Sequence, residues 1–440
     1  MDNWRIDKSL ELQNKAARLI PGMTQLLSKR PDMYSRGVWP AYFKKAKGCH
    51  VVDLDDNEYI DCSICGIGAT VLGYCDDDVN AAVLDVVTSG SASTLNSPEE
   101  VALAEKLIEL HPWAKMARFA RSGGEAMAVA VRIARTYTGK DKVLFCGYHG
   151  WFDWYLAANL GKKDALDKMW LAGLPPNGVP KGLKGTALPF MFNDMASLNA
   201  ALDEAGDDLA AIVMEPMRNY RPKADFMEAV HNAASKRHIP LIMDEISAGF
   251  RICNGGAHLK LGWRPDMAVF AKAMGNGYPI SAIIGKEDVM SAAQEAFITS
   301  TNWTERIGPA AALAVIDKFI ACDVSRHLVA IGDKVWQGWE TLANKHGLQV
   351  SIGGISPMIH FAFTENNNVN KAYFVQEMLK KGFLASTGFY SMYAHGFADI
   401  DMYLQACDEV FGKLSRLIAS NSVEENLQGK PAQVGFARIN

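Results

Sequence analysis

Four short apolar stretches of the chain each end at side chains that can do chemistry. The side chains, with the stretches that they follow, are Tyr148 and His149 (142–146), Glu215 (209–214), Asp244 and Glu245 (241–243) and Lys272 (267–271). Continuous apolar runs of this length are typical of strands buried on both faces of a parallel sheet. Because ligands bind beyond the carboxyl ends of such strands, the four endings predict one common site if the strands are neighbours.

Lys272 and Asp244 are the strongest indication of a common site. A polar residue after a strand is common, and each one alone is explained as an ordinary strand end. Together, a lysine after one buried strand and an aspartate after another are poor for stability, because both charges approach a desolvated region. The pair therefore favours catalysis over structure.

The segment after residue 118 predicts a helix whose first turn binds an anion. Ser122 at the N-cap and Glu125 three residues later form a capping box, and Gly139 is a plausible stop. Gly123 and Gly124 would let an anion approach the exposed N–H groups at the positive end of the helix dipole. The alternative is a capped helix whose glycines only allow tight packing.

Other cofactor and metal motifs do not fit the chain. There is no Walker loop, no HExxH and no GxSxG, and 66–71 lacks the third glycine of a dinucleotide motif. Cys62 and Cys65 form a CxxC, which raises a zinc or redox site as an alternative. No second CxxC follows, and both cysteines are expected to be small core residues beside a hairpin over 51–61. We therefore predict no metal.

An anion site of the size of a monophosphate, an aspartate, a lysine and the aromatic pair Tyr148 and His149 remain. This combination suits pyridoxal 5′-phosphate (PLP), since the lysine would form the Schiff base and the aspartate would pair with the ring nitrogen.

Five successive motifs resemble those of the class III aminotransferases. They are SGGEA (122–126), GYHG (147–150), EP (215–216), DEISAGFR (244–251) and AKAMGNGYP (271–279). Their order and spacing match along most of the chain. The chain is most similar to the branch that contains glutamate-1-semialdehyde aminomutase, and PG (21–22), LGY (72–74) and YAH (393–395) agree at the flanks.

The resemblance implies an α/β protein of fold type I. A large PLP-binding domain over 76–315 would contain a mostly parallel seven-stranded sheet. A smaller α+β domain would be assembled from both termini, over 1–75 and 316–440. The resemblance also implies a homodimer whose active site is shared across subunits.

The resemblance also implies a role for each motif residue. Lys272 would carry the Schiff base, Asp244 would pair with the ring nitrogen, and Ile246 and Tyr148 would cover the two ring faces. The other residues expected to bind the cofactor are Ser122, Gly123 and Gly124 around the phosphate, Glu215, and Thr304, which would act on the partner's cofactor.

Two departures from the family pattern stand out. Gly124 replaces the usual threonine, which removes a hydroxyl donor from the phosphate site. NWTER (302–306) replaces a more glycine-rich stretch, and similar segments occur in relatives that aminate sugars for bacterial surface polysaccharides. We therefore expect an amino group to move from L-glutamate to an aldehyde or keto sugar acid.

Both substrates of that reaction would carry carboxylates, which arginine binds well. The expected substrate contacts are Arg30, Asn219 and Trp303, with Arg36, Arg218, Arg221 and Trp151 as further candidates. For each arginine the alternative is a solvated surface residue, and for each tryptophan a place in the core.

Three other functions stay open. A 2,1-aminomutase of the glutamate-1-semialdehyde type would return the amino group to its own substrate, and other class III aminotransferases would use other acceptors. A non-catalytic PLP-binding regulator is expected to lose Lys272 or Asp244, and the chain retains both.

Composition excludes several partners. The 440 residues are 49% hydrophobic and carry a net charge of −4, which gives no basic field for nucleic acid or anionic membrane. The apolar runs are far shorter than the ~20 residues of a membrane span, and the N-terminus lacks a signal-peptide core. Eight cysteines without export signals are expected to be reduced thiols in a cytoplasmic protein. The sequence leaves two alternatives for the polar tail 421–440: it packs on the partner subunit, or it is mobile.

Overall fold

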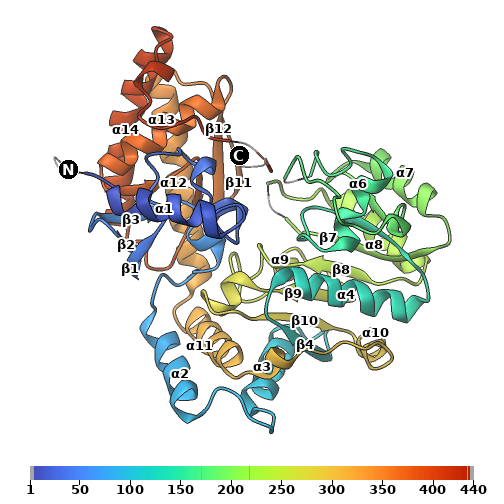
Figure 1. Cartoon of the computed structure of the whole chain (residues 1–440). Coiled ribbons are helices and arrows are strands. Elements are labelled where there is room, and N and C mark those ends of the chain that lie inside the picture. Colours follow the sequence, from blue (N-terminus) through green and yellow to red (C-terminus); the bar gives the residue numbers. More distant parts are fainter. Residues whose placement is uncertain (1–3, 170, 218, 434, 437–440) are drawn as a thin grey trace. The chain divides into compact units, whose positions relative to one another are not determined.

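The computed structural model describes residues 4–169, 171–217, 219–433 and 435–436 (Figure 1). The chain divides into two compact units. The terminal unit joins Met1–Asp76 with Arg326–Asn440, and the central unit is Asp77–Ser325. The expected boundary at residue 315 falls inside a helix, α11 (Ile307–Ala321), which packs on the first two helices of the central unit. The units therefore divide after Ser325 rather than after residue 315.

The central unit alternates helices and strands. Its elements are α2 (Asp77–Ser89), α3 (Pro98–Leu110), β4 (Met116–Ala120), α4 (Gly123–Thr138), β5 (Lys142–Cys146), α5 (Asp153–Leu156), α6 (Ala158–Gly161), β6 (Ala187–Pro189), α7 (Met195–Ala205), β7 (Leu209–Met214), α8 (Ala224–Lys236), β8 (Leu241–Asp244), α9 (Ala257–Lys260), β9 (Met267–Phe270), β10 (Ser281–Gly285), α10 (Glu287–Ser291) and α11.

One seven-stranded sheet forms the middle of the central unit, in the order β4-β10-β9-β8-β7-β5-β6. Strands β9, β8, β7, β5 and β6 are parallel, and β10 is antiparallel to both of its neighbours. The mostly parallel sheet of fold type I is thus confirmed. Every residue of β7, β8 and β9 is buried, as their unbroken apolar sequences require.

The four predicted strands β5, β7, β8 and β9 are consecutive in this sheet. Their carboxyl ends therefore meet at one edge, where GYHG, Glu215, Asp244 and Lys272 follow them. The condition for a common site is met.

Helix α4 begins and ends where the sequence predicts. Ser122 is its N-cap, Glu125 completes the capping box, and Gly139 ends it in the left-handed conformation. The buried stripe of α4 packs on β7, β9 and β10. Packing fixes the helix, so its first turn is presented at a defined place.

The terminal unit combines two small sheets with long helices. Its elements are α1 (Asp7–Leu19), β1 (Phe43–Lys47), β2 (His50–Asp53), β3 (Glu58–Cys62), α12 (Val324–His346, beginning two residues before the boundary), β11 (Val350–Ile355), β12 (Met358–Phe363), α13 (Asn367–Lys380), β13 (Phe383–Ala385), β14 (Gly388–Tyr390) and α14 (Phe397–Ala419). The sheets have the orders β1-β2-β3-β13 and β11-β12-β14.

Both chain ends contribute to the terminal unit. Strand β13 pairs with β3, which places the predicted 51–61 hairpin next to the C-terminal part. The tail also packs within this unit, since Lys430 donates its N–H to Arg36 and Gln433 donates its N–H to Asp32.

The CxxC cysteines Cys62 and Cys65 are buried side chains of the terminal unit, and neither forms a disulfide. Across the described ranges, no group of three or more His, Cys, Asp or Glu side chains has a metal-binding arrangement. Within the same ranges, no helix is both long and apolar enough to cross a membrane.

A buried histidine network lies behind β8. Glu245, directly after Asp244, accepts hydrogen bonds from the N–H groups of Ala257 and His258 and pairs with the His258 ring (2.7 Å). His111 stacks on His258 and accepts the N–H of Gly256 through Nε2 (3.0 Å). Burial lowers the pKa of His111 from 6.5 to about 4.

This network predicts acid sensitivity. The unfolded chain takes up a proton at His111 near pH 6.5, whereas the folded protein does so only near pH 4, so stability is lost as the pH falls between these values. We expect the free energy of unfolding to drop by about 3 kcal/mol over this window through His111 alone. Urea unfolding at several pH values measures it. His111→Gln should flatten the slope, and exposed His231→Gln is the matched control. Equal slopes in His111→Gln and the unmodified protein would rule out this role.

Candidate active site

Asp244 ends β8 and is fixed in a single position. Its carboxylate is 3% exposed, lies 2.7 Å from Nδ1 of His149 through Oδ2, and accepts the N–H of Ile246 through Oδ1 (3.0 Å). The His149 ring is 1% exposed and stacks on Trp154. Nδ1 must carry the proton to bond a carboxylate, so the imidazole donates to Asp244. Asp244 thus presents a localised negative charge at the sheet edge.

Lys272 follows β9, the strand next to β8. Its backbone is in the left-handed region, with φ 45°. This conformation destabilises a residue other than glycine by about 1–3 kcal/mol, and such strain is found mainly where a functional site requires it. The ammonium Nζ donates to Oγ of Ser247 at 2.8 Å. The strained turn and the hydroxyl of Ser247, three residues after Asp244, therefore fix the direction of the Lys272 side chain.

The first turn of α4 lies against Ile246. A Cβ atom at Gly123 would be 2.8 Å from the Ile246 side chain, so a larger residue there would force Ile246 to shift. The helix leaves N–H groups of this turn without helical acceptors, and glycine keeps them accessible. The anion-binding turn and the end of β8 are thus side by side.

Gly124 has a structural reason for replacing threonine. A Cβ atom there would lie 3.0 Å from the ring of Phe152, and the Cα of Gly124 would be 3.2 Å from a Cβ atom at Gly150. The Phe152 ring fills the space that a threonine side chain would need. An anion bound at this turn would therefore depend more on backbone N–H groups.

Glu215 and Tyr148 are joined across the ends of β7 and β5. Oε2 of Glu215 accepts the N–H of Tyr148 at 3.2 Å. Gly147, with φ 121°, brings the chain so close that a Cβ atom would lie 2.6 Å from the same oxygen. Tyr148 is half-buried and meets the Tyr155 ring edge to face.

These contacts join all but one of the expected cofactor residues. Ser122 caps the helix that begins with Gly123 and Gly124, and its hydroxyl accepts the N–H of Glu125 (3.4 Å). The exception is Thr304, which is exposed and whose hydroxyl donates to the carbonyl of Thr301 (3.2 Å). Within one chain, Thr304 is not joined to the others.

The expected substrate residues are scattered. Asn219 lies in a pocket with Glu215, and Trp303 packs against the core and lines a second cavity with Trp151. Arg30 belongs to the terminal unit, where it is 5% exposed and forms a bidentate pair with Asp32 (2.6 and 3.2 Å). A substrate carboxylate would have to share the guanidinium with Asp32. Arg218 lies outside the described residues.

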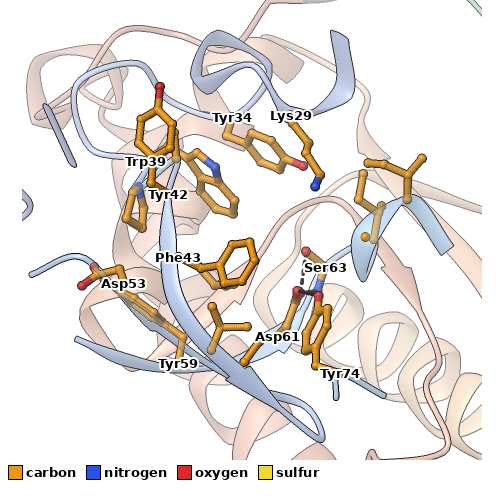
Figure 2. Close-up of a pocket in the computed structure, with 18 residues that line it drawn as sticks. Lys29, Tyr34, Trp39, Tyr42, Phe43, Asp53, Tyr59, Asp61, Ser63 and Tyr74 are labelled. Atoms are coloured by element: carbon orange, nitrogen blue, oxygen red, sulfur yellow. Dashed lines mark hydrogen bonds between the residues drawn. The ribbon is translucent and has the colours of Figure 1, made fainter. Parts of the chain in front are cut away.

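The terminal unit has an aromatic pocket of its own (Figure 2). Tyr34 and Trp39 stack at 3.9 Å on one side, and Lys29 points inward beside them. On the other side Asp61 accepts hydrogen bonds from the hydroxyls of Ser63 (2.6 Å) and Tyr74 (2.5 Å). Asp61 is engaged within the fold, and so is Asp53, the other carboxylate of the lining, which accepts hydrogen bonds from Asn57 and Tyr59. Lys29 is the cation in this lining.

Three residues that contribute to the site are not evident from the sequence. The sequence indicates His149 as part of an aromatic pair with Tyr148 but not as the partner of Asp244, because β5 and β8 are separated by β7 in the sheet. Ser247 is three residues after Asp244, and no motif rule singles it out. Phe152 explains Gly124 only through a contact in space.

The site fits PLP. A lysine amine, a buried carboxylate with its own donor, an apolar side chain beside an anion-binding helix turn and a half-buried tyrosine are the groups that this cofactor needs. The fold and the site together define a PLP enzyme of fold type I.

Comparison with known proteins identifies the family. The sequence model described as "Aminotransferase class-III" matches residues 33–395. The 3-aminobutyryl-CoA aminotransferase of Cloacimonas acidaminovorans (strain Evry) is 31% identical over 431 residues, which cover 95% of this chain and 100% of that protein. The 2′-deamino-2′-hydroxyneamine transaminase of Streptomyces kanamyceticus is 33% identical over 360 residues, 82% of this chain and 86% of that protein. The chain belongs to the class III aminotransferases and is a PLP-dependent transaminase.

Two further likenesses agree with this family. The structure of the Sphingopyxis sp. MTA144 FumI protein with PLP has a TM-score of 0.85 at 25% identity, covering 96% of this chain and 98% of that one. A glutamate-1-semialdehyde 2,1-aminomutase of Anaeromyxobacter dehalogenans (strain 2CP-1 / ATCC BAA-258) is 31% identical over 373 residues, 82% of this chain and 84% of that protein. The expected likeness to the aminomutase branch is confirmed.

The Asp244–His149 pair gives a graded prediction. Asp244→Asn removes the negative charge and should lower kcat by several orders of magnitude with the fold retained. His149→Phe keeps the ring but removes the donor, and a hydrogen bond to a charged group is worth about 1.5–3 kcal/mol, so kcat should fall about 10- to 100-fold. Steady-state kinetics with saturating PLP measures both. His231→Gln serves as a control for loss of a histidine. Wild-type kcat in His149→Phe would show that the pair does not support catalysis.

Proposed function

We propose that this transaminase moves the amino group of L-glutamate to an aldehyde or keto sugar acid, with 8-oxo-3,8-dideoxy-manno-octulosonate, a precursor for lipopolysaccharide, as the acceptor. The observation that carries the amino transfer is that Lys272, held by Ser247, follows the strand next to the one that ends at the fixed charge of Asp244. The sugar acceptor is supported by the NWTER segment and by the relative named for a neamine derivative.

The residues divide the work as follows. When bound, PLP supplies an electron sink for the carbanion that forms at the substrate Cα. Asp244 keeps a proton on the ring nitrogen, and His149 keeps Asp244 in place. The amine of Lys272 would take the proton from the substrate Cα and deliver it to C4′ of the bound cofactor, and Ser247 would orient that amine. The N–H groups of the α4 turn and Ser122 bind the phosphate, and Tyr148 and Ile246 cover the ring.

Amino transfer in two halves predicts ping-pong kinetics. L-Glutamate leaves as 2-oxoglutarate before the acceptor enters, so each product must depart before the next substrate binds. The same residues serve both halves, because the proton moves between the same two positions in opposite directions.

A homodimer is part of the proposal. Thr304 is exposed, and by its place in the family motif it would act on the partner's cofactor. Large apolar side chains of the central unit are also exposed, including Leu95 and Phe297. Such surface is typical of protein interfaces. A cytoplasmic location is proposed as well, because none of the eight cysteines, all within the described residues, forms a disulfide.

A 2,1-aminomutase is the second candidate, favoured by the Anaeromyxobacter relative. It would use the same lysine and aspartate but would release no keto acid. A non-catalytic regulator has no comparable support, since Lys272 and Asp244 are both present and positioned.

Arg30 is proposed to bind a substrate carboxylate, together with contacts from Asn219 and Trp303. Arg30→Ala should then raise KM for the acidic substrate with little change in kcat, since uniform binding is lost. Because Asp32 is left buried without its partner, the variant is compared with Asp32→Asn, which breaks the pair but retains the guanidinium. A KM rise in both variants alike, or in neither, would remove Arg30 from the substrate site.

The direct test of the amino donor uses the yellow holoenzyme and L-glutamate alone. We expect the visible band to bleach with release of 2-oxoglutarate in a 1:1 ratio to active sites, and an acceptor sugar acid to restore the band. Lys272→Ala is the control and should show neither change. Absence of bleaching would contradict glutamate as the donor and would favour a different donor or the aminomutase.

A further inference from the structure

A small pocket opens at the carboxyl ends of β5 and β7, inside the central unit. Its volume is about 160 Å³, and its lining includes Lys168, Asn219, Tyr220 and Glu215, with Met169 and Phe192 as apolar walls. Glu215 is the residue that also bonds the N–H of Tyr148 (3.2 Å). The pocket therefore shares a wall with the cofactor site.

The polar groups of this pocket are matched to an acid that carries hydroxyls. Lys168 is exposed, and within the described ranges its ammonium makes no ion pair or hydrogen bond. The same holds for the side-chain amide of Asn219. Glu215 is 6% exposed, one of its oxygens accepts the N–H of Tyr148, and a carboxylate oxygen can accept more than one donor.

The charges also set the orientation in which a ligand would bind. A carboxylate placed against Glu215 would be repelled, whereas a hydroxyl can donate to that oxygen. A carboxylate next to Lys168 and Asn219 gains one charged and one neutral donor. Tyr220, 67% exposed, lies at the rim. The ligand that satisfies all of these groups is a hydroxy acid, with its hydroxyl toward Glu215 and its carboxylate toward Lys168.

We propose that this pocket is the subsite for the hydroxy-carboxylate end of the acceptor, with Lys168 as its specificity-determining cation. The inference rests on the proposed function in one respect, because it takes the acceptor to be a sugar acid. It adds the residue that distinguishes an acidic sugar from a neutral one.

The test is calorimetric binding to the PLP-loaded enzyme. D-Gluconate carries both groups, sorbitol has the hydroxyls alone and propionate has the carboxylate alone. We expect D-gluconate to bind at least tenfold more tightly than either comparator. Lys168→Met should weaken D-gluconate at least tenfold with sorbitol unchanged, and Lys168→Arg should keep part of the affinity. Lys163→Met, an exposed lysine of the same segment, is the matched control and should bind like the unmodified enzyme.

Two results would overturn the subsite: equal D-gluconate affinity in Lys168→Met and Lys163→Met, or no preference for D-gluconate in the unmodified enzyme. Bleaching by L-glutamate is recorded on the same samples. If bleaching fails while D-gluconate binding still depends on Lys168, the donor assignment falls and the subsite stands. If bleaching succeeds without Lys168 dependence, the transaminase stands and the subsite falls.

Discussion

The contact between Asp244 and His149 is the interaction on which the rest of the site depends. A carboxylate with 3% exposure at the end of a buried strand is costly unless donors surround it. His149 and the N–H of Ile246 provide those donors at 2.7 and 3.0 Å. The carboxylate can then remain charged in a desolvated place, which is where a charge acts most strongly on a neighbouring ring.

The fold stabilises this contact because the residues of the site lie on, or directly after, rigid strands and a rigid helix. Asp244 and Lys272 follow adjacent strands, and the first turn of α4 is fixed by a capping box and by packing on the sheet. At Gly123 and Gly147 the absence of a side chain lets Ile246 and Glu215, respectively, approach the backbone closely. Lys272, one of several non-glycine residues with positive φ, lies just after a buried strand, so rigid structure supports its strained backbone.

Local sequence patterns were enough to predict the parallel strands, their polar endings and helix α4, because each follows from residues close together in the chain. What depends on distant residues was not predicted. The His149–Asp244 pair joins strands that are not neighbours, and Phe152 fills the space at Gly124 through a fold contact. The sequence predicts Arg30 as a substrate contact, with a solvated surface residue as the alternative, but does not predict that Asp32 and the packing of the terminal unit bury it. The acceptor is set by loops, whose side-chain geometry no motif specifies.

The most direct test of the central claim is the protonation state of the cofactor ring nitrogen. Holoenzyme loaded with ring-¹⁵N pyridoxal phosphate can be examined by NMR across neutral pH, alongside the Asp244→Asn variant. If the buried carboxylate keeps its charge, the ring nitrogen stays protonated in the unmodified enzyme and loses its proton in the variant. A deprotonated ring nitrogen in the unmodified enzyme, or the same ¹⁵N shift in both proteins, would contradict the role assigned to Asp244.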